Sequence, residues 1–152
     1  MLQFSDGETF AVGAIQYIYA PATENETTNR IKLPILLEIE KSVEVLAVLD
    51  TGAPYPILDP TIAKAIGFSS ELAIERISML VRGIKLEGSL IRLNITLVAD
   101  RGQNLTVDAT TFVPDSEFAW DNFPCFIGLS GFLERIRFAI DPNTDTFYFG
   151  SL

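Results

Sequence analysis

The chain has 152 residues, 48% of them hydrophobic, with a formal charge of −9, a single cysteine and no histidine. This length and composition predict one domain with a packed core, and the negative charge argues against binding to nucleic acid or to anionic membranes. The missing histidines exclude Ser-His and Cys-His nucleophiles and the usual zinc sites, so we expect no metal and no cofactor, and chemistry carried by carboxylates, hydroxyls, amines or the backbone.

Residues 1–29 are predicted to be an N-terminal extension that precedes a main domain at residues 30–152. The first ten residues, "MLQFSDGETF", lack the charged-then-apolar layout of a signal peptide, and no apolar run could span a bilayer, so we expect a soluble, cytoplasmic protein. The next stretch, "FAVGAIQYIYA", is rich in β-forming residues and predicts a strand that ends at Pro21. The extension is either a propeptide or the source of an interface strand.

Two strands and a helix are expected next. Residues 30–40 ("RIKLPILLEIE") and 41–50 ("KSVEVLAVLD") are close enough in sequence to form a hairpin. A short helix should follow, because Asp59 can cap its N-terminus and Pro60 suits its first position. Gly67 suits the position just beyond its end.

Strand-like sequence returns at residues 76–100, where Gly83 and Gly88 are predicted to bracket the turn of a long hairpin. Residues 105–114 predict a further strand. In the irregular segment after it, Phe118 and Trp120 either pack under a loop or line a substrate cleft. This order of elements predicts a mostly-β fold, closed or sandwich-like, with one or two short helices.

The last part of the chain begins with a short apolar strand at Cys125, whose thiol is expected in the core rather than as a nucleophile. Ser130 can cap a short helix over residues 131–136. The final strands are joined by the turn "DPNTD", in which Asp141 is expected to accept backbone hydrogen bonds rather than act as a second catalytic acid.

The segment "AVLDTGAPYPIL" carries the strongest chemical signal. An apolar strand ends at Asp50, which fixes the direction of the carboxylate. Thr51 offers a hydroxyl, Gly52 permits an unusual backbone conformation and close approach of another chain, and Ala53 keeps the turn small so that its amide can point at the carboxylate. Two nearby carboxylates can share one proton and activate a water, but the chain has only one Asp-Thr-Gly. The second aspartate must then come from another copy across a two-fold axis.

These features resemble the retropepsin-like aspartic proteases. The resemblance covers residues 30–150 and rests on "VLDTGA", on the helix after it, and on the late block "FIGLSGFLERI". It implies an all-β, closed, barrel-like acid-protease fold with one or two short helices, and a homodimeric endopeptidase that cuts peptide or protein substrates.

The resemblance also implies roles for individual residues. Asp50 would be the catalytic aspartate, and Thr51 would hydrogen-bond its symmetry mate. The hairpin with Gly83, Ile84, Lys85 and Gly88 would be a flap over the substrate. Ile127 and Gly128 would form the second turn of the fold. All of these roles are what the resemblance implies.

Two alternatives stay open at the level of the sequence. The tip of the expected flap, "VRGIKLEGS", is polar where the family often has a glycine-rich tip. The polar tip favours a protease-like homodimer that binds peptides without cutting them. A structural homodimer with a vestigial groove is the other alternative.

Overall fold

Two β-sheets organise the chain in the computed structural model, which describes residues 1–115 and 124–152. The strands are β1 (Gly13–Gln16), β2 (Ile18–Pro21), β3 (Asn29–Glu38), β4 (Ser42–Leu49), β5 (Glu75–Val81), β6 (Ile84–Leu97), β7 (Arg101–Gly102), β8 (Leu105–Pro114), β9 (Cys125–Ile127), β10 (Ile136–Asp141) and β11 (Thr146–Ser151). The mostly-β fold expected from the sequence is therefore confirmed. Phe118 and Trp120 lie outside the described residues.

The larger sheet has the strand order β5-β6-β3-β4-β9, with β2 added to β3 and β8 added to β6. Its centre is the predicted β3–β4 hairpin, in which Lys32 lies opposite Val48 and Glu38 opposite Ser42. On β3 the buried residues Leu33, Ile35 and Leu37 alternate with more exposed ones, as expected for a strand with one face on the core. This alternation fixes the register, because a slip by one residue would expose the whole apolar set.

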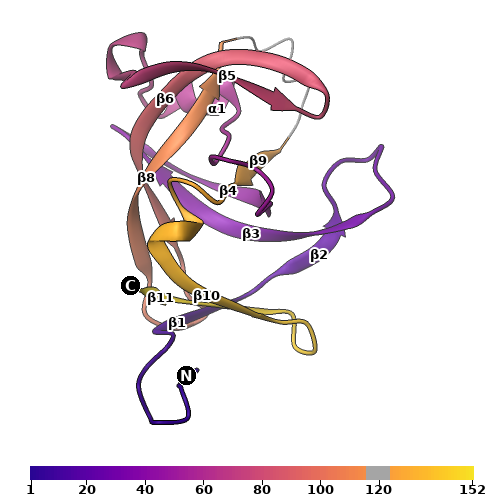
Figure 1. The fold of residues 1–152 in the computed structure, drawn as a ribbon, viewed down its shortest axis with the longest axis vertical. Coiled ribbons are helices and arrows are strands. Elements are labelled where there is room, and N and C mark those ends of the chain that lie inside the picture. The colour runs from indigo at the N-terminus through magenta and orange to yellow at the C-terminus, as the bar shows by residue number, and fades with distance from the viewer. Residues whose placement is uncertain (116–123) are drawn as a thin grey trace.

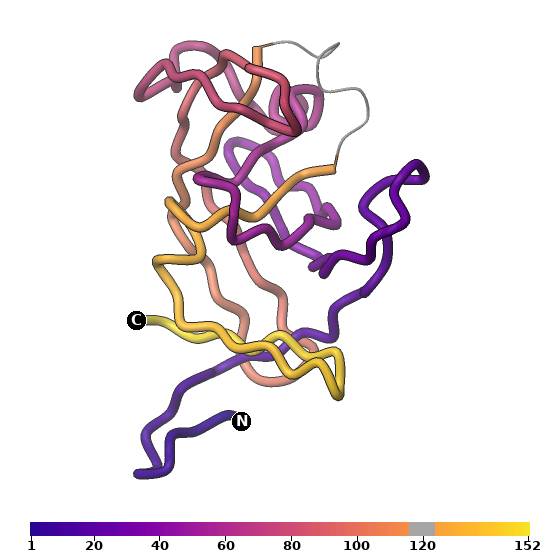
Figure 2. Tube along the Cα trace, turned by 45° about the vertical axis from the view of Figure 1, so that its right-hand side comes forward, coloured from indigo at the N-terminus to yellow at the C-terminus, as the bar shows by residue number. Residues whose placement is uncertain are grey.

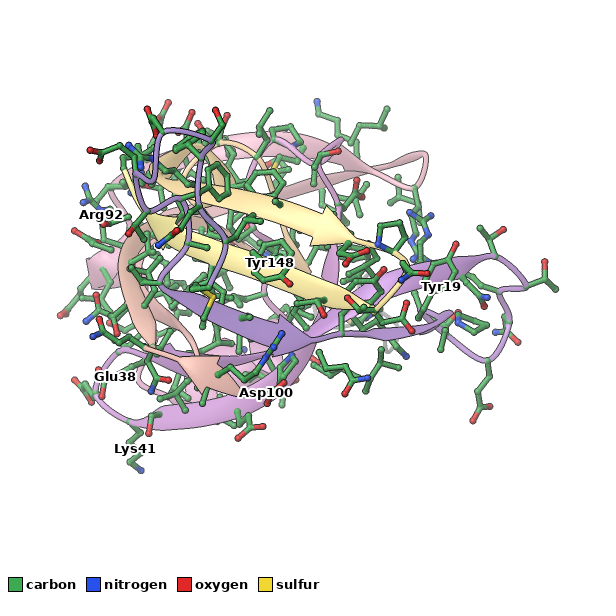
Figure 3. All side chains as sticks on the ribbon, turned by 90° about the horizontal axis from the view of Figure 1, so that it is seen from below. Tyr19, Glu38, Lys41, Arg92, Asp100 and Tyr148 are labelled. Carbon is green, nitrogen blue, oxygen red and sulfur yellow. The ribbon has the colours of Figure 1, made fainter. Side chains whose placement is uncertain are left out.

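The smaller sheet has the order β10-β11-β1-β7 and lies at the bottom of Figure 1, with the β5–β6 hairpin at the top. Figure 3 views the molecule from below, so the strands of this sheet cross the picture, with Tyr148 on β11. Phe147 and Phe149 of β11 are fully buried and join the main core. The stretch predicted as an N-terminal extension contributes β1 to this sheet and β2 to the larger one.

The predicted helix is confirmed as α1 (Pro60–Ala65). The Asp59 carboxylate accepts a hydrogen bond from the N–H of Thr61 at 2.8 Å, and Pro60 occupies the first turn. Gly67 follows the helix with a φ of +116°, a conformation that favours glycine. Two short 3₁₀ helices, η1 (Ser70–Leu72) and η2 (Leu133–Arg135), complete the described helices.

Three sequence-based expectations about the elements differ from the structure. The turn between β5 and β6 consists of Arg82 and Gly83 alone, so Gly88 lies inside β6 and not at the turn. Ser130 does not cap the late helix, which is a 3₁₀ turn that begins after Phe132 without a side-chain cap. The pairings among the described strands leave both sheets open, so they do not confirm a closed barrel.

Burial separates a large core from a smaller cluster under the β5–β6 hairpin. The smaller cluster joins Met79, Val81 and Leu86 of the hairpin to Ile57 and Phe126 below it. Among the described residues, no helix is both long and apolar enough to cross a lipid bilayer.

Candidate active site

Asp50 follows the last residue of β4, where this strand pairs in parallel with β9. Leu49 lies opposite Ile127, and the backbone N–H of Asp50 donates to the carbonyl of Ile127 at 3.0 Å. Two strands from distant parts of the sequence thus fix the position of Asp50, whose side chain is half-buried. Asp50 therefore lies at a strand end, as the sequence predicts.

The turn after Asp50 is held by hydrogen bonds back to this residue. The N–H of Gly52 donates to Oδ1 of Asp50 at 3.0 Å, and the N–H of Ala53 donates to the Asp50 backbone carbonyl at 3.1 Å. Two expectations are corrected here: Gly52, and not Ala53, presents its amide to the carboxylate, and the φ of Gly52 is not positive. A Cβ at Gly52 would lie 3.2 Å from Oδ1, so its absence leaves space beside the carboxylate. Thr51 is exposed on the surface next to it.

The second turn predicted from the sequence packs directly against the first. A Cβ at Gly128 would lie 2.3 Å from the carbonyl carbon of Tyr55, a distance that no side chain could occupy. The N–H of Leu129 donates to the carbonyl of Ala53 at 2.9 Å. Ile57 and Phe126 exchange two further backbone hydrogen bonds, at 3.0 and 2.9 Å. The loop that carries Asp50 is therefore fixed along its length by residues 126–129.

The β5–β6 hairpin ends beside this loop in a two-residue turn. Arg82 and Gly83 have φ values of 51° and 81°, the two positive values that a type I′ turn requires. The guanidinium of Arg82 pairs with the carboxylate of Glu26 at 2.5 Å and lies 5.5 Å from the centre of the Phe126 ring. The hairpin tip is thereby linked to the β2–β3 hairpin, which projects from the side of the molecule in Figures 1 and 2.

A cavity of about 150 Å³ lies between the Asp50 loop and this hairpin. Its polar lining comes from Asp50, Arg30 and Arg82. The remaining lining residues are mainly apolar and come from the loop, from β5 and from β9: Gly52, Ala53, Pro54, Ile57, Met79, Leu80, Val81 and Phe126. The arrangement combines one carboxylate with an apolar wall, which suits a ligand that brings both a polar centre and side chains.

The sequence prediction identified only part of this lining. Asp50, Gly52 and Ala53 are present, whereas Gly83, Ile84, Lys85 and Gly88 are not among the lining residues. Gly88 instead packs against β8, since a Cβ there would lie 2.2 Å from the carbonyl oxygen of Val113.

Eight of the lining residues were not predicted as site residues, among them Arg30, Met79, Val81 and Arg82. On β5 the polar Arg76 and Ser78 alternate with Ile77 and Met79, which is a period-2 signal for the inward face of the strand. The apolar but exposed Leu80 interrupts this signal before Val81. Nothing local marks Arg30, which reaches the cavity through strand pairing.

Three aspartates outside the cavity have structural partners. Asp108 and Asp115 are about half exposed and pair with Arg92 and Arg76 respectively. A hydrogen bond from Arg76 is the largest cause that holds the pKa of Asp115 below its ordinary value. Asp141 accepts from the N–H of Asn143 at 2.9 Å, which confirms its predicted role in the turn.

Cys125 is buried, as expected, and burial raises the pKa of its thiol to about 11. A buried thiol with this pKa is protonated and unreactive at neutral pH. Among the described residues, no group of acidic and cysteine side chains could hold a metal ion.

No protein-family model and no curated protein sequence matches the chain. Comparison of structures does find relatives. A retropepsin-like aspartic protease from Rickettsia conorii superposes with a TM-score of 0.58 at 22% identity, over 92% of this chain and 94% of that one. The chain has the retropepsin-like fold. The retroviral protease-like domain of Ddi1 from Leishmania major is also similar, with a TM-score of 0.52 at 18% identity, over 80% of this chain and 90% of that domain.

Both superpositions span most of the two chains compared, and at these identities the likeness establishes the fold.

Proposed function

We propose that this protein is an aspartic endopeptidase that acts as a homodimer, with Asp50 of each copy forming one catalytic pair. The observation that carries this proposal is the position of Asp50, which lies at a strand end, under a hairpin and beside a cavity that also has apolar side chains in its lining. One chain supplies one such carboxylate, and a two-fold axis supplies the second.

The proposed chemistry needs two carboxylates that share one proton, since like charges a few ångströms apart do not both ionise readily. The ionised carboxylate takes a proton from a water as the water oxygen attacks the peptide carbonyl carbon. The neutral one gives its proton to the carbonyl oxygen. The tetrahedral intermediate then collapses and the C–N bond breaks. The carboxyl that took the water proton gives it to the leaving amine, and the other carboxylate regains a proton from a hydroxyl of the intermediate, which restores the pair.

A peptide substrate would bind in an extended conformation. β5 is the terminal strand of its sheet in the described pairing, so one of its edges is available for backbone hydrogen bonds with a peptide. The apolar wall formed by Ile57, Met79 and Phe126 would receive substrate side chains. The β5–β6 hairpin acts as the flap in this proposal, Thr51 ties the two copies together, and the enzyme works in the cytoplasm.

The second candidate is a homodimer that binds peptides without cutting them. The ion pair between Arg82 and Glu26 favours it, because it links the hairpin tip to another part of the same chain. A flap held in this way would open less readily for substrate exchange.

Cleavage of a peptide library from acidic to neutral pH tests the two candidates. Asp50→Asn should reduce kcat by a factor of about 10²–10⁴, the usual contribution of a general acid or base. Asp108→Asn is the matched control, because it removes an exposed carboxylate outside the cavity and should retain activity. Equal rates for wild type and Asp50→Asn would refute the assignment of Asp50. Binding of a pepstatin-like inhibitor without cleavage of any peptide would favour the second candidate.

A further inference from the structure

Arg30 is the second residue of β3 and lies on the same side of the hairpin as Asp50. The β3–β4 register pairs Lys32 with Val48. Continuing this antiparallel register by two residues brings Arg30 opposite Asp50. Arg30 and Asp50 line the same cavity. The proposed catalytic carboxylate thus shares its cavity with an arginine, which comes from a position that the local sequence does not mark.

The Nε atom of Arg30 is buried and has no hydrogen-bond partner among the described residues. An N–H donor that is removed from water without an acceptor destabilises the protein. The other arginine of the cavity differs in this respect, because Arg82 is paired with Glu26. The cavity thus contains Arg82, whose charge is balanced by Glu26, and Arg30, whose Nε–H group has no acceptor among the described residues.

We propose that Arg30 determines specificity by binding a carboxylate of the substrate peptide. This inference rests on the proposed function and adds a preference to it: the enzyme favours peptides that carry a carboxylate close to the scissile bond. The planar guanidinium matches a carboxylate through two parallel N–H···O bonds, which makes arginine the natural partner for such a group. The carboxylate comes either from an Asp or Glu side chain or from the C-terminus of the peptide.

The surroundings of Arg30 favour a short-range preference of this kind. The chain carries a formal charge of −9, so its overall field does not attract acidic peptides. Selection of a carboxylate must then come from direct contact inside the cavity, where Arg30 lies among apolar side chains. A peptide with Gln in place of Glu gives the guanidinium no carboxylate to bind, so it should be cleaved with a lower kcat/KM.

Matched peptides and matched variants test the proposal. Peptides that differ only by Glu or Gln at each position flanking the cleaved bond are compared in kcat/KM, and free C-termini are compared with amidated ones. Wild type should prefer the carboxylate at one position by about tenfold to a hundredfold, the range for hydrogen bonds to charged groups. A preference in the Glu and Gln pairs identifies a side-chain carboxylate, whereas a preference for free over amidated C-termini identifies the C-terminal carboxylate.

In Arg30→Met the preference should fall to about one, because the stem is kept and the charge is removed. Arg92→Met, which removes an arginine on β6 outside the cavity, should keep the wild-type ratio. Arg30→Lys keeps the charge but loses the planar fork, so it should show a reduced preference and serves if Arg30→Met does not fold. Thermal unfolding of each variant confirms that folded proteins are compared.

Equal wild-type rates in both comparisons, Glu against Gln and free against amidated C-termini, or a preference that survives in Arg30→Met, would overturn the proposal. A dimer that dissociates more readily in Arg30→Met, with the preference unchanged, would assign Arg30 to the subunit interface instead. If wild type cuts no peptide, the proposed function fails separately. Binding of the same peptides to Asp50→Asn then reports the preference of Arg30 without any cleavage.

Discussion

Gly128 shows how a single residue fixes the site. The carbonyl carbon of Tyr55 would lie 2.3 Å from a Cβ at this position, so only glycine allows the two turns to meet. The contact holds the loop after Asp50 against the segment after β9. The sequence predicted both turns, but it could not show that they touch, because Tyr55 and Gly128 are 73 positions apart.

Thr111 provides a test of buried polarity at the same scale. Its side chain is fully buried, and its hydroxyl has no hydrogen-bond partner among the described residues. Replacing it with the isosteric Val removes an unsatisfied polar atom, so we expect Thr111→Val to raise the free energy of unfolding by about 1 kcal/mol. Urea denaturation measures the change.

Thr146 is the matched control, because its buried hydroxyl lies 2.9 Å from that of Thr144. Thr146→Val should lower the free energy of unfolding by about 1 kcal/mol, since it breaks a satisfied hydrogen bond. A greater loss of stability in Thr111→Val than in Thr146→Val would show that the Thr111 hydroxyl has a partner after all.

Cys125 makes a prediction about alkaline pH. Burial raises the pKa of its thiol from 9.0 to about 11, while a hydrogen bond from the backbone of Asp59 opposes the shift. The folded state therefore retains the proton over a range in which the unfolded chain loses it. The stability linked to this proton is complete below pH 9.0 and declines as the pH rises to about 11.

The free energies of unfolding of wild type and Cys125→Ala, measured from pH 8 to 11, isolate this effect. As the pH rises, the free energy of unfolding of wild type should fall relative to that of Cys125→Ala, because the Ala variant has no thiol to ionise. A constant difference across the range would contradict the burial-driven shift.

At the scale of elements, the sequence predicted those strands and helices that are stabilised by residues close together in the chain. The β3–β4 hairpin and α1 follow from alternation and from capping residues that lie within a few positions of one another. The β5–β6 turn was placed wrongly because Gly88 was interpreted as a turn residue. The structure uses Gly88 for close packing of β6 on β8, and it forms the turn with Arg82, whose φ is positive although it has a side chain.

The cap of α1 can be tested separately from the site. Asp59→Ala removes the acceptor for the N–H of Thr61 and should lower the free energy of unfolding by about 1 kcal/mol. Asp59→Ser should recover most of this loss, because Ser is also a good capping residue.

Ser69 supplies the control for the cap, since it precedes η1 without a side-chain hydrogen bond to that helix. Ser69→Ala should change the stability by less than about 0.5 kcal/mol, as is usual for exposed surface positions. A loss in Ser69→Ala equal to that in Asp59→Ala would show that the side-chain hydrogen bond of Asp59 does not account for the effect.

At the scale of the whole molecule, pairing between distant strands brings together cavity residues that the sequence could not predict. Asp50 and its turn were found because the motif is continuous. Arg30 joins the cavity from a neighbouring strand, and Arg82 from the tip of a hairpin 32 residues further along than Asp50. A single sequence carries no signal for such contacts between distant residues, whereas the order of strand-like segments was enough to predict a mostly-β domain.

The proposed homodimer makes activity depend on protein concentration. If each copy contributes one Asp50, dilution below the dissociation constant should reduce activity per mole of chain, and substrate or inhibitor should oppose the loss. Sedimentation measured over the same concentrations should show dimers giving way to monomers. Undiminished specific activity in a sample that sediments only as monomer would contradict the shared site.

The parallel pairing of β4 with β9 has a consequence for the order in which the protein is made. Residues 47–49 of β4 have their parallel partners at residues 125–127, so the loop that carries Asp50 lacks this support until those residues have left the ribosome. Contacts of such long sequence separation form late in folding. A nascent chain therefore cannot fix the Asp50 carboxylate in position before residues 125–127 have been synthesised.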